Sequence, residues 1–351
     1  MRNVSQREIE EMLKAEGKEF DLLIEKAGKV RRKHVGNKVY LRGVIEFTNK
    51  CSKNCYYCGI RKGNKSLKRY FMSKEDILKS VRFASEKGLG SVVLQGGELK
   101  GKQYVSFIEE IIKEIKRIDS SLMITLSLGE AGFDDYKRWF DAGAERCLLR
   151  IETSNSDLYK KWHPQDHKFE ERLKCLENIK KIGYQTGTGV LIGAPYQTIE
   201  DLAKDILFYK DFDVDMIGMG PYVIHYQTPW GSEFKDWFER ERENIFKLAI
   251  KMIAATRIVM KDINIASTSA LAALHSEGRV IGLKAGGNVI MPDITLPEYK
   301  ENYKLYENKP SLNSPLEQSL NSILLVIDRA GFIPAIGEEG SSLHYLKRVS
   351  G

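Results

Sequence analysis

Residues 51–58 have the sequence Cys-Ser-Lys-Asn-Cys-Tyr-Tyr-Cys, and the rest of the chain can be interpreted outward from them. Three of the five cysteines in this 351-residue chain fall within these eight residues, with the spacing C-x3-C-x2-C. Three thiolates on one short loop can hold three irons of a 4Fe–4S cluster and leave the fourth iron open to a small molecule. The pattern therefore indicates an iron–sulfur site with Cys51, Cys55 and Cys58 as its ligands.

Two other uses of clustered cysteines fit the sequence less well. A structural zinc site needs four ligands, and no fourth cysteine or histidine follows at zinc-finger spacing. A disulfide framework is disfavoured because the remaining cysteines, Cys147 and Cys175, are scattered in a long chain. Residues 44–47 are Val-Ile-Glu-Phe, the pattern of a buried strand that ends just before the cysteine loop.

Composition limits the location and the partners of the protein. No apolar run is long enough to cross a bilayer, and Met1–Ser5 does not begin a secretory signal. Clustered free thiols and an oxygen-sensitive cluster predict a cytoplasmic protein. The net charge of +7 arises from 55 basic and 48 acidic residues that are mixed along the chain, which indicates a salt-bridged surface rather than a nucleic-acid-binding one.

Apolar strand patterns alternate with helical patterns through most of the chain. Ser91–Gln95, for example, has a continuous apolar centre, Val-Val-Leu, as a parallel strand buried on both faces should have. The predicted strands are Arg42–Phe47, Ser91–Gln95, Leu122–Ser127, Arg146–Glu152, Gly187–Ile192, Asp215–Met219, Ile263–Ala266 and Asn288–Met291. Eight strands with intervening helices predict an α/β fold, a closed (β/α)8 TIM-type barrel. An open six-strand barrel with a C-terminal appendage is the alternative.

We expect three parts in the chain. Residues 1–36 form an N-terminal helical extension that begins at a capping box, Ser5 to Glu8. Residues 37–292 form the barrel, and residues 293–351 form a C-terminal extension over one barrel mouth, ending in a tail.

Polar residues follow several predicted strands, where a barrel of this kind places its chemistry. The second strand leads into Gly96-Gly97-Glu98, and the third is followed by Ser127 and Glu130. The fourth carries Arg150 and Glu152 on one face. Taken alone, these segments also fit a turn, helix caps and a structural ion pair.

The cysteine spacing, the flanking strand and the Gly-Gly-Glu segment together resemble the radical S-adenosylmethionine (SAM) superfamily, in its biotin synthase-like group. The resemblance implies an enzyme with one 4Fe–4S cluster and SAM as cofactors, in which SAM chelates the open iron and is cleaved to a 5′-deoxyadenosyl radical. It implies that Gly96–Glu98 hold the amino group of SAM, that Glu152 accepts from the ribose and that Arg172 binds the carboxylate.

The resemblance also implies sites for the remaining parts of SAM. Tyr57 and the strand end at Ile192 would lie beside the adenine. Ser127 and Glu130 would face the methionyl part or the substrate, and Arg150 would accompany Glu152. Arg172 is equally compatible with a surface helix position.

The last strands of the barrel should shape the substrate side. Thr268 and Ser269, at the start of a helix, can bind an anion or can simply cap the helix. Met291, Tyr303 and Tyr306 can line the cavity, although plain packing is the more common use of such residues.

Further motifs resemble the HydE family of FeFe-hydrogenase maturases. Residues 218–222 are Gly-Met-Gly-Pro-Tyr, with Thr-Pro at 228–229; residues 278–283 are Gly-Arg-Val-Ile-Gly-Leu, followed by Gly-Asn-Val-Ile-Met-Pro at 287–292. The resemblance implies a maturase that acts on a small substrate in assembly of the diiron subcluster. That substrate is thought to be an iron–cysteine complex bearing carbonyl and cyanide. The other hydrogenase maturases would be its partners.

Two other functions stay open at this stage. One is a radical SAM enzyme of small-metabolite biosynthesis, similar to methylornithine synthase or biotin synthase. The other is an iron–sulfur carrier with no use for SAM. For a SAM enzyme, the basic stretch Arg61–Arg69 is either a solvated loop or a docking patch for an electron donor such as ferredoxin or flavodoxin.

One departure from the family concerns its C-terminal region. Many HydE proteins carry an accessory cluster on three cysteines, and here Ser311, Ser319 and Ser322 occupy the corresponding spacing. Natural loss and deliberate replacement both fit, and the coincidence of three serines favours replacement. We therefore predict one cluster per chain.

Overall fold

A closed ring of parallel strands forms the centre of the molecule. The structure is a computed structural model that describes residues 4–310, 312 and 314–350. The strands of the main sheet are β1 (Lys38–Leu41), β2 (Gly43–Thr48), β3 (Ser91–Gly96), β4 (Met123–Ser127), β5 (Arg146–Leu148), β6 (Gln185–Thr188), β8 (Met216–Ile217), β10 (Asn264–Ser267), β11 (Val289–Ile290) and β12 (Ile333–Ala335).

The ring closes at β1 and β2, which are separated only by Arg42 and act as one strand position. β1 pairs with β11, with Tyr40 opposite Val289, and β2 pairs with β3, with Val44 opposite Val93. The N–H of Arg42 donates to the Ile290 carbonyl over 3.1 Å, so the hydrogen bonds between β1 and β11 continue into the residue that joins β1 to β2. The predicted TIM-type barrel is therefore confirmed, and an open six-strand sheet does not describe these pairings. Two short strands, β7 (Leu191–Ile192) and β9 (Gly220–Pro221), pair with each other beyond β6 and β8.

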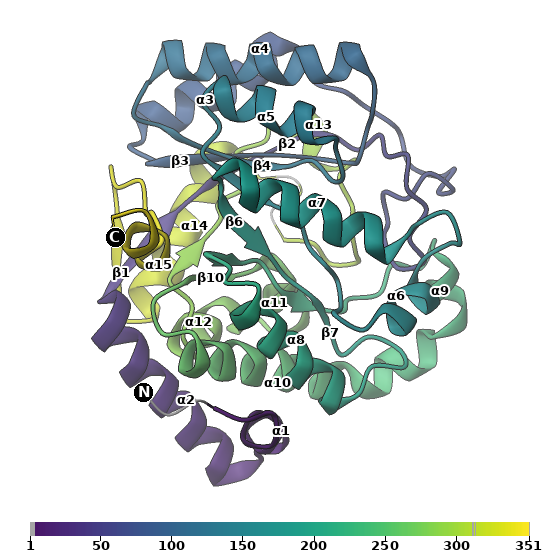
Figure 1. The fold of residues 1–351 in the computed structure, drawn as a ribbon, viewed down its shortest axis with the longest axis vertical. Helices are drawn as coiled ribbons and strands as arrows, with labels where there is room; N and C mark the ends of the chain where they lie inside the picture. Colours follow the sequence, from purple (N-terminus) through teal and green to yellow (C-terminus); the bar gives the residue numbers. More distant parts are fainter. Residues whose placement is uncertain (1–3, 311, 313, 351) are drawn as a thin grey trace.

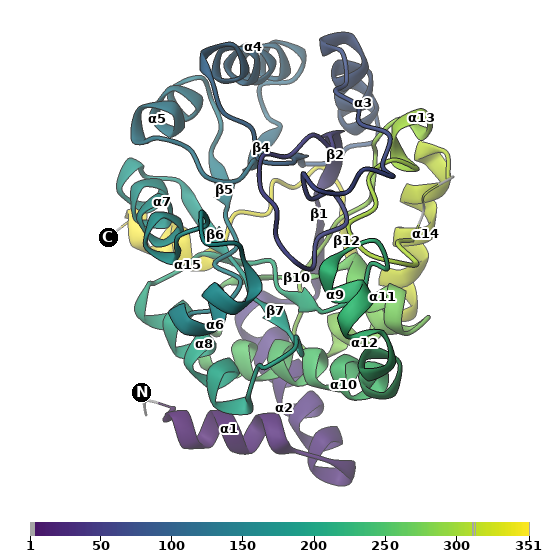
Figure 2. The same cartoon turned by 90° about the vertical axis from the view of Figure 1, so that its right-hand side faces the viewer.

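Helices surround the strands, as Figure 2 shows in a view into the barrel. α4 illustrates the reason, because apolar residues recur every three or four positions along it and most of them are buried in the core. The helices are α1 (Gln6–Lys14), α2 (Gly17–Val35), α3 (Lys74–Glu86), α4 (Lys102–Ile118), α5 (Phe133–Asp141), α6 (Ser156–Trp162), α7 (Phe169–Ile182), α8 (Ile199–Asp211), α9 (Pro229–Glu233), α10 (Lys235–Val259), α11 (Ser269–Leu274), α12 (Gly278–Lys284), α13 (Pro297–Lys300), α14 (Leu316–Arg329) and α15 (Leu343–Ser350).

Local capping signals in the sequence were accurate at the helix starts. Ser5 and Glu8 form a reciprocal capping box at α1, and Thr198 with Asp201 forms another at α8. α1 and α2 lie outside the ring of barrel helices (Figure 1), where they pack against α8 and α10. In the part of the chain that is described, no helix is both long and apolar enough to cross a membrane.

The C-terminal residues close the barrel at the N-terminal ends of its strands, where we had expected only a tail. β12 joins the sheet beside β1, and the following segment enters the barrel base. There Arg146 donates to the Glu339 carbonyl (2.8 Å), and Asn264 donates to the Gly340 carbonyl (2.9 Å). Arg146 is fully buried, so these main-chain oxygens satisfy a charge that the sequence could not show to be internal. The division into three parts stays a prediction.

Two segments cover the opposite mouth. Residues 49–73, between β2 and α3, cross it in Figure 2. The excursion after β11, residues 293–310, is bonded to this loop through Asn49 Nδ2 to the Asn302 carbonyl (2.6 Å) and Gly59 N–H to the Leu305 carbonyl (2.9 Å). The cysteine loop is therefore held between the barrel and a second layer of chain.

Candidate functional site

The three clustered cysteines are free, half-buried thiols on the loop that follows β2. Burial raises the pKa of each thiol, that of Cys58 to about 12, and the neighbouring cysteines raise the pKa values of Cys55 and Cys58 further. Among the described residues, no three His, Cys, Asp or Glu side chains converge on a single metal ion. Three free thiols on one loop fit a cubane, which would bind each of them through a different iron.

A glycine cradle brings the loop after β3 against the cysteine loop. A Cβ atom on Gly97 would lie 2.3 Å from the Lys50 carbonyl oxygen and 2.7 Å from Cys51 Cβ. Ser52 closes the same contact, because its N–H donates to the Glu98 carbonyl over 2.8 Å. The Gly-Gly-Glu segment therefore lies directly against the first predicted ligand.

The basic stretch after the cysteines is partly structural. Arg69 donates to the carbonyls of Asn49 (2.6 Å) and Ile60 (2.8 Å), and Arg61 donates to that of Cys55 (3.1 Å). These two guanidiniums fasten the loop around the cysteines. Three lysines of the stretch, Lys62, Lys65 and Lys68, are exposed.

Four buried charges form a network beside the cysteines. Lys53 Nζ lies 2.6 Å from Glu130 Oε2 and 3.4 Å from Glu98 Oε1. Arg172 Nε lies 2.7 Å from Glu130 Oε1, and Arg172 Nη2 lies 3.9 Å from Glu98 Oε2. Arg172 is therefore an interior residue of α7, and its surface interpretation is wrong.

The two carboxylates of this network differ in their environments. Burial raises the pKa of Glu98, and the charge of Glu130 raises it further. Burial also acts to raise the pKa of Glu130, but Arg172 and Lys53 outweigh it and lower that pKa. Glu98 Oε1 is buried and has no hydrogen-bond partner within the described chain. A buried carboxylate oxygen of this kind fits an ammonium ligand.

Arg150 and Glu152 contact each other, as their spacing predicted, although β5 is shorter than the predicted strand. β5 ends at Leu148, and Glu152 has a φ of 68°, an uncommon backbone conformation for a residue other than glycine. Arg150 Nη2 lies 3.0 Å from Glu152 Oε2. That oxygen is buried and makes no hydrogen bond in the described structure, so Glu152 retains an acceptor for a ligand hydroxyl.

The predicted adenine side is apolar and ordered. Tyr57 packs 5.5 Å from the ring of Trp230, and its hydroxyl lies 3.0 Å from His163 Nε2. Ile192 is fully buried in β7, and its carbonyl already accepts from the Tyr222 N–H over 2.7 Å. Ser127 ends β4 opposite Gln95.

The predicted substrate residues gather at the ends of the last strands. Ser269 Oγ lies 2.6 Å from the Tyr306 hydroxyl, and Gln95 Nε2 donates to the Tyr303 hydroxyl over 3.4 Å. Thr268 occupies the N-cap position of α11, but its side chain makes no cap bond and its buried Oγ1 has no partner in the described structure. Met291 lines two cavities of about 50 and 70 Å³.

Sequence reasoning missed a second charged group, which lines the cavity of about 70 Å³. Lys309 forms an ion pair with Glu46 and lies 3.6 Å from Asp293 Oδ2. Burial raises the pKa of Glu46 to about 8, and Asp293 adds to the rise. Arg279 lines the same cavity with an unpartnered, buried Nε. Glu46 was the signal in the sequence that could have revealed this group, because it is a charged residue within an apolar strand.

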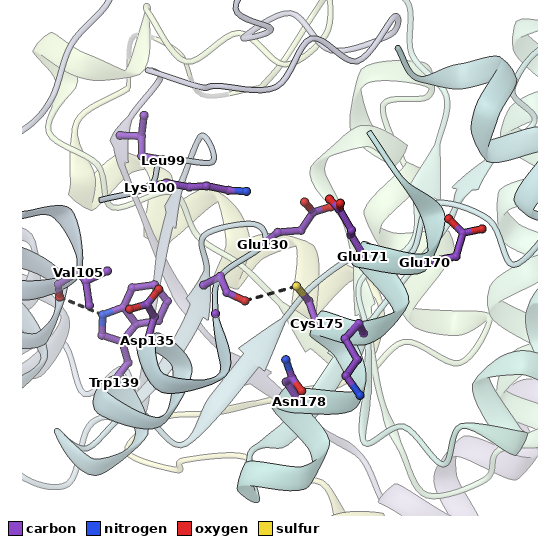
Figure 3. A pocket seen from close by; sticks show the side chains of 13 residues that line it. Leu99, Lys100, Val105, Glu130, Asp135, Trp139, Glu170, Glu171, Cys175 and Asn178 are labelled. Atoms are coloured by element: carbon purple, nitrogen blue, oxygen red, sulfur yellow. Dashed lines mark hydrogen bonds between the residues drawn. The ribbon is translucent and has the colours of Figure 1, made fainter. Parts of the chain in front are cut away.

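A cavity of about 520 Å³ lies outside the barrel and is drawn in Figure 3. α4, α5 and α7 supply most of its walls, and Cys175 Sγ donates to the Ala131 carbonyl at its edge (3.5 Å). Glu130 is its only member from the charged network. Lys53, Glu98 and Arg172 do not line this cavity, so Glu130 stands between it and the charged network.

The two described serines at the accessory-cluster spacing differ in exposure. Ser311 lies outside the described residues. Ser319 is buried and its Oγ accepts from Lys300 Nζ over 3.0 Å, whereas Ser322 is exposed. These two serines therefore point to different environments.

Comparisons with known proteins agree with this geometry. A profile of the Radical SAM superfamily matches residues 45–209. The chain is 44% identical over 290 residues to FeFe hydrogenase maturase subunit HydE of Thermotoga maritima, covering 82% of this chain and 80% of that protein. It is 25% identical over 274 residues to 3-methylornithine synthase of Methanosarcina acetivorans, covering 78% and 74%.

Solved structures show the same fold. Methylornithine synthase PylB superposes with a TM-score of 0.81 at 23% identity, covering 95% of both chains. The maturase HydG of Carboxydothermus hydrogenoformans superposes with a TM-score of 0.77 at 21% identity, covering 95% of this chain and 76% of that one.

The family determines the cofactors. Radical SAM enzymes use a 4Fe–4S cluster and SAM, and Cys51, Cys55 and Cys58 fit the motif of that superfamily. The glycine cradle at Gly97, and the buried oxygens of Glu98 and Glu152 that accept no hydrogen bond in the described structure, fit the same two groups. The chain is thus a radical SAM enzyme that belongs to the family of the FeFe-hydrogenase maturase HydE.

Proposed function

We propose that this protein is a radical SAM maturase that cleaves SAM reductively and acts on a small substrate in assembly of the diiron subcluster of FeFe hydrogenase. The observation that carries the proposal is the 44% identity to HydE over 82% of the chain. The three cysteines and the charged network beside them supply a site for the required cofactors.

Cys51, Cys55 and Cys58 ligate the cluster in this proposal. Once bound, the cluster and SAM supply radical chemistry through a 5′-deoxyadenosyl group. The chain contributes the shape and burial of the loop. Arg61 and Arg69 hold its carbonyls inward, and Gly97 allows the loop after β3 to approach Cys51.

The residues after β3, β5 and on α7 bind SAM. Glu98 accepts from the amino group with Oε1, which accepts no hydrogen bond in the described structure, and Arg172 binds the carboxylate with the guanidinium that Glu130 orients. Glu152 accepts from the ribose hydroxyls. Tyr57 and Ile192 provide apolar contact for the adenine. Gly96, Ser127 and Arg150 complete the walls of this site.

The substrate occupies the chamber beside Met291, below the covering segment. Ser269 lines it next to Thr268, Tyr306 is bonded to Ser269, and Tyr303 is bonded to Gln95 of its wall. The excursion excludes water through its bonds to the cysteine loop. The family implies an iron–cysteine complex with carbonyl and cyanide ligands as the substrate. Buried, unpartnered polar atoms at Thr268 and Arg279 support a polar ligand there.

The remaining parts of the proposal concern partners and location. Ferredoxin or flavodoxin would supply the electron, and the exposed Lys62, Lys65 and Lys68 offer an acidic donor a complementary surface. Other hydrogenase maturases would supply the substrate and receive the product. A reducing cytoplasm is the compartment that suits free cysteines and an iron–sulfur cluster.

In vitro maturation tests the proposal. Hydrogenase that lacks its diiron subcluster is incubated with the other maturases, SAM, reductant and this protein, and hydrogen evolution is measured. Wild-type protein should restore activity, Cys55→Ser should not, and Cys175→Ser, which changes a cysteine outside the cluster loop, should behave as wild type.

Product analysis separates the alternatives. An adenosyl group recovered on sulfur supports the maturase. Active SAM cleavage with no restored hydrogenase, and with hydrogen transferred into 5′-deoxyadenosine from a metabolite, would instead indicate a biosynthetic enzyme similar to methylornithine synthase. Absence of SAM binding would indicate a cluster carrier.

A further inference from the structure

The backbone between the cysteines is bonded to a short segment that ends α6 and continues beyond it, residues 162–167. The N–H of Asn54 donates to His167 Nε2 over 2.9 Å, and the N–H of Tyr56 donates to the Trp162 carbonyl over 3.2 Å. Both donors lie between Cys51 and Cys58. A region more than a hundred residues away thus determines how this loop is shaped.

The protonation of His167 follows from its contacts. Because Nε2 accepts an amide N–H, the ring proton lies on Nδ1, which is 2.9 Å from the Asp166 carboxylate. His167 is only 4% exposed, whereas Asp166 is on the surface. Nδ1 makes no hydrogen bond within the described structure, so the Asn54 amide that Nε2 accepts on the inside is what fixes the tautomer.

His163 has the same tautomer for an equivalent reason. Its Nδ1 lies 2.8 Å from the Tyr159 carbonyl, which can only accept, so Nδ1 carries the proton. Nε2 is then the acceptor for the Tyr57 hydroxyl at 3.0 Å. His163 is 2% exposed and stacks on the Tyr159 ring, with centroids 3.9 Å apart. The orientation of the tyrosine beside Cys58 is therefore determined by a buried, neutral histidine.

This arrangement reaches the proposed SAM site from a second direction. The Tyr159 hydroxyl is buried and has no hydrogen-bond partner in the described part of the chain. The charges that act on it are those of Arg172, Glu130, Cys55 and Glu152. One stack of rings thus connects the cysteine loop with the residues proposed to hold SAM.

We propose that residues 162–167 are a clamp in which His163 and His167 act as positioning residues for the cluster loop. His167 keeps the Asn54 amide occupied, and His163 holds the Tyr57 ring in place. Backbone N–H groups beside ligating cysteines are potential donors to cluster sulfur, and hydrogen bonds to sulfur make the reduction potential less negative. By taking the Asn54 amide, His167 maintains a low potential, which reductive cleavage of SAM requires.

The inference rests on Cys51, Cys55 and Cys58 being the cluster ligands, as proposed above. Iron analysis separates the two claims. If wild-type protein binds no cluster, the ligand assignment fails; if it binds one that is indifferent to the histidines, only the clamp fails.

A set of four variants tests the clamp in full-length, cluster-loaded protein without SAM. His167→Ala removes the acceptor. His167→Gln places an amide near the position of Nε2, whereas His167→Asn is too short to reach it. His275→Ala is the matched control, because His275 Nδ1 also accepts a backbone N–H, that of Glu277 at 3.1 Å, in an exposed segment away from the loop.

The readouts are the midpoint potential from a redox titration followed by EPR, the EPR line shape, and the rate of iron loss to a chelator. We expect the alanine and asparagine variants to have a less negative potential and to lose iron about tenfold faster. The glutamine and His275 variants should resemble wild type. Identical potentials and rates for His167→Asn and His167→Gln would overturn the clamp.

His163 is tested through the ligand that Tyr57 would contact. His163→Phe retains a ring to stack on Tyr159 but removes the acceptor of the Tyr57 hydroxyl. We expect weaker binding of SAM by the cluster-loaded protein, by about tenfold, with the wild-type circular dichroism spectrum retained. An unchanged dissociation constant would exclude a positioning role for His163.

Discussion

Arg172 Nε lies 2.7 Å from Glu130 Oε1, although the two residues are carried by α7 and by the loop after β4. The Arg172 Nη1 also donates to the Arg150 carbonyl over 2.9 Å, so the guanidinium is fixed on two sides. A guanidinium held in this way is already oriented before it meets an anion, which reduces the entropy lost on binding.

Replacing Arg172 by lysine should weaken SAM binding about tenfold, or about 1.4 kcal/mol, because lysine keeps the charge but loses the planar fork. The measurement is the SAM dissociation constant of the cluster-loaded protein. Lys174→Gln is the control, because Lys174 lies on the same helix with a side chain that is 69% exposed. Equal affinities for wild type and Arg172→Lys would remove Arg172 from the binding site.

A side chain at Gly97 should cost the protein its cluster while leaving the fold in place, because the glycine lies directly against the cysteine loop. Gly97→Ala would place a methyl group 2.3 Å from the Lys50 carbonyl oxygen and displace the cysteine loop, at a cost of about 1–3 kcal/mol. Iron content and the thermal unfolding midpoint should both fall. Gly132→Ala is the matched change, because a methyl group there meets only ordinary contact at 3.4 Å.

The number of clusters follows from the cysteines. Reconstituted protein should contain about four irons per chain, the content of one 4Fe–4S cluster. Ser319 is buried and its hydroxyl accepts a hydrogen bond from Lys300 Nζ, so it is not available as a cluster ligand. About eight irons per chain would contradict the prediction, and so would a cluster that survives the replacement of Cys51, Cys55 and Cys58 by serine.

Much of the fold could be predicted because parallel barrel strands are apolar on both faces and are separated by amphipathic helices. The predicted strands Ser91–Gln95 and Leu122–Ser127 lie within one residue of the actual ends of β3 and β4. β5 was overestimated because its apolar pattern continues to Glu152, where the backbone turns to a positive φ. A reversal of φ is a property of the tertiary site, which residue type alone does not reveal.

The site could be predicted where chemistry requires particular residues at fixed spacing, and less well elsewhere. The cysteines and Gly96–Glu98 are local motifs. Lys53 and Lys309 were missed, because a lysine is usually exposed and only the fold shows that these two are buried against carboxylates. The C-terminal segment at the barrel base was also missed. Its Glu339 and Gly340 carbonyls accept from Arg146 and Asn264, and contacts between residues so far apart in the chain leave no local pattern.

His344, in the C-terminal helix α15, predicts a pH effect on the stability of the fold. His344 lies between Asp213, with Nε2 2.6 Å from Oδ1, and Asp262, with Nδ1 3.2 Å from Oδ1. Hydrogen bonds to Asp262 and Asp213 raise the pKa of His344 despite partial burial. Because the folded-state pKa is the higher one, protonated His344 stabilises the protein fully below its ordinary pKa, and this contribution is lost as the pH rises through the raised value.

The measurement is the free energy of unfolding of wild type and His344→Gln from pH 5.5 to pH 9. Lys347 and Arg348 also face these carboxylates but remain charged over this range, so the difference between the two proteins reports His344. Wild type should exceed the variant most at the acid end. A difference that grows toward pH 9 would have the wrong sign for this explanation.

The most direct test of the central claim asks whether SAM binds the iron that the three cysteines leave open. Reduced, cluster-loaded protein is mixed with SAM labelled with 15N in its amino group and 17O in its carboxylate, and examined by electron–nuclear double resonance. The account predicts hyperfine coupling of both labels to the cluster, and its loss in Glu98→Gln and Arg172→Gln at SAM concentrations that saturate the wild type. A cluster whose spectrum does not respond to SAM, with no coupling to either label, would contradict it.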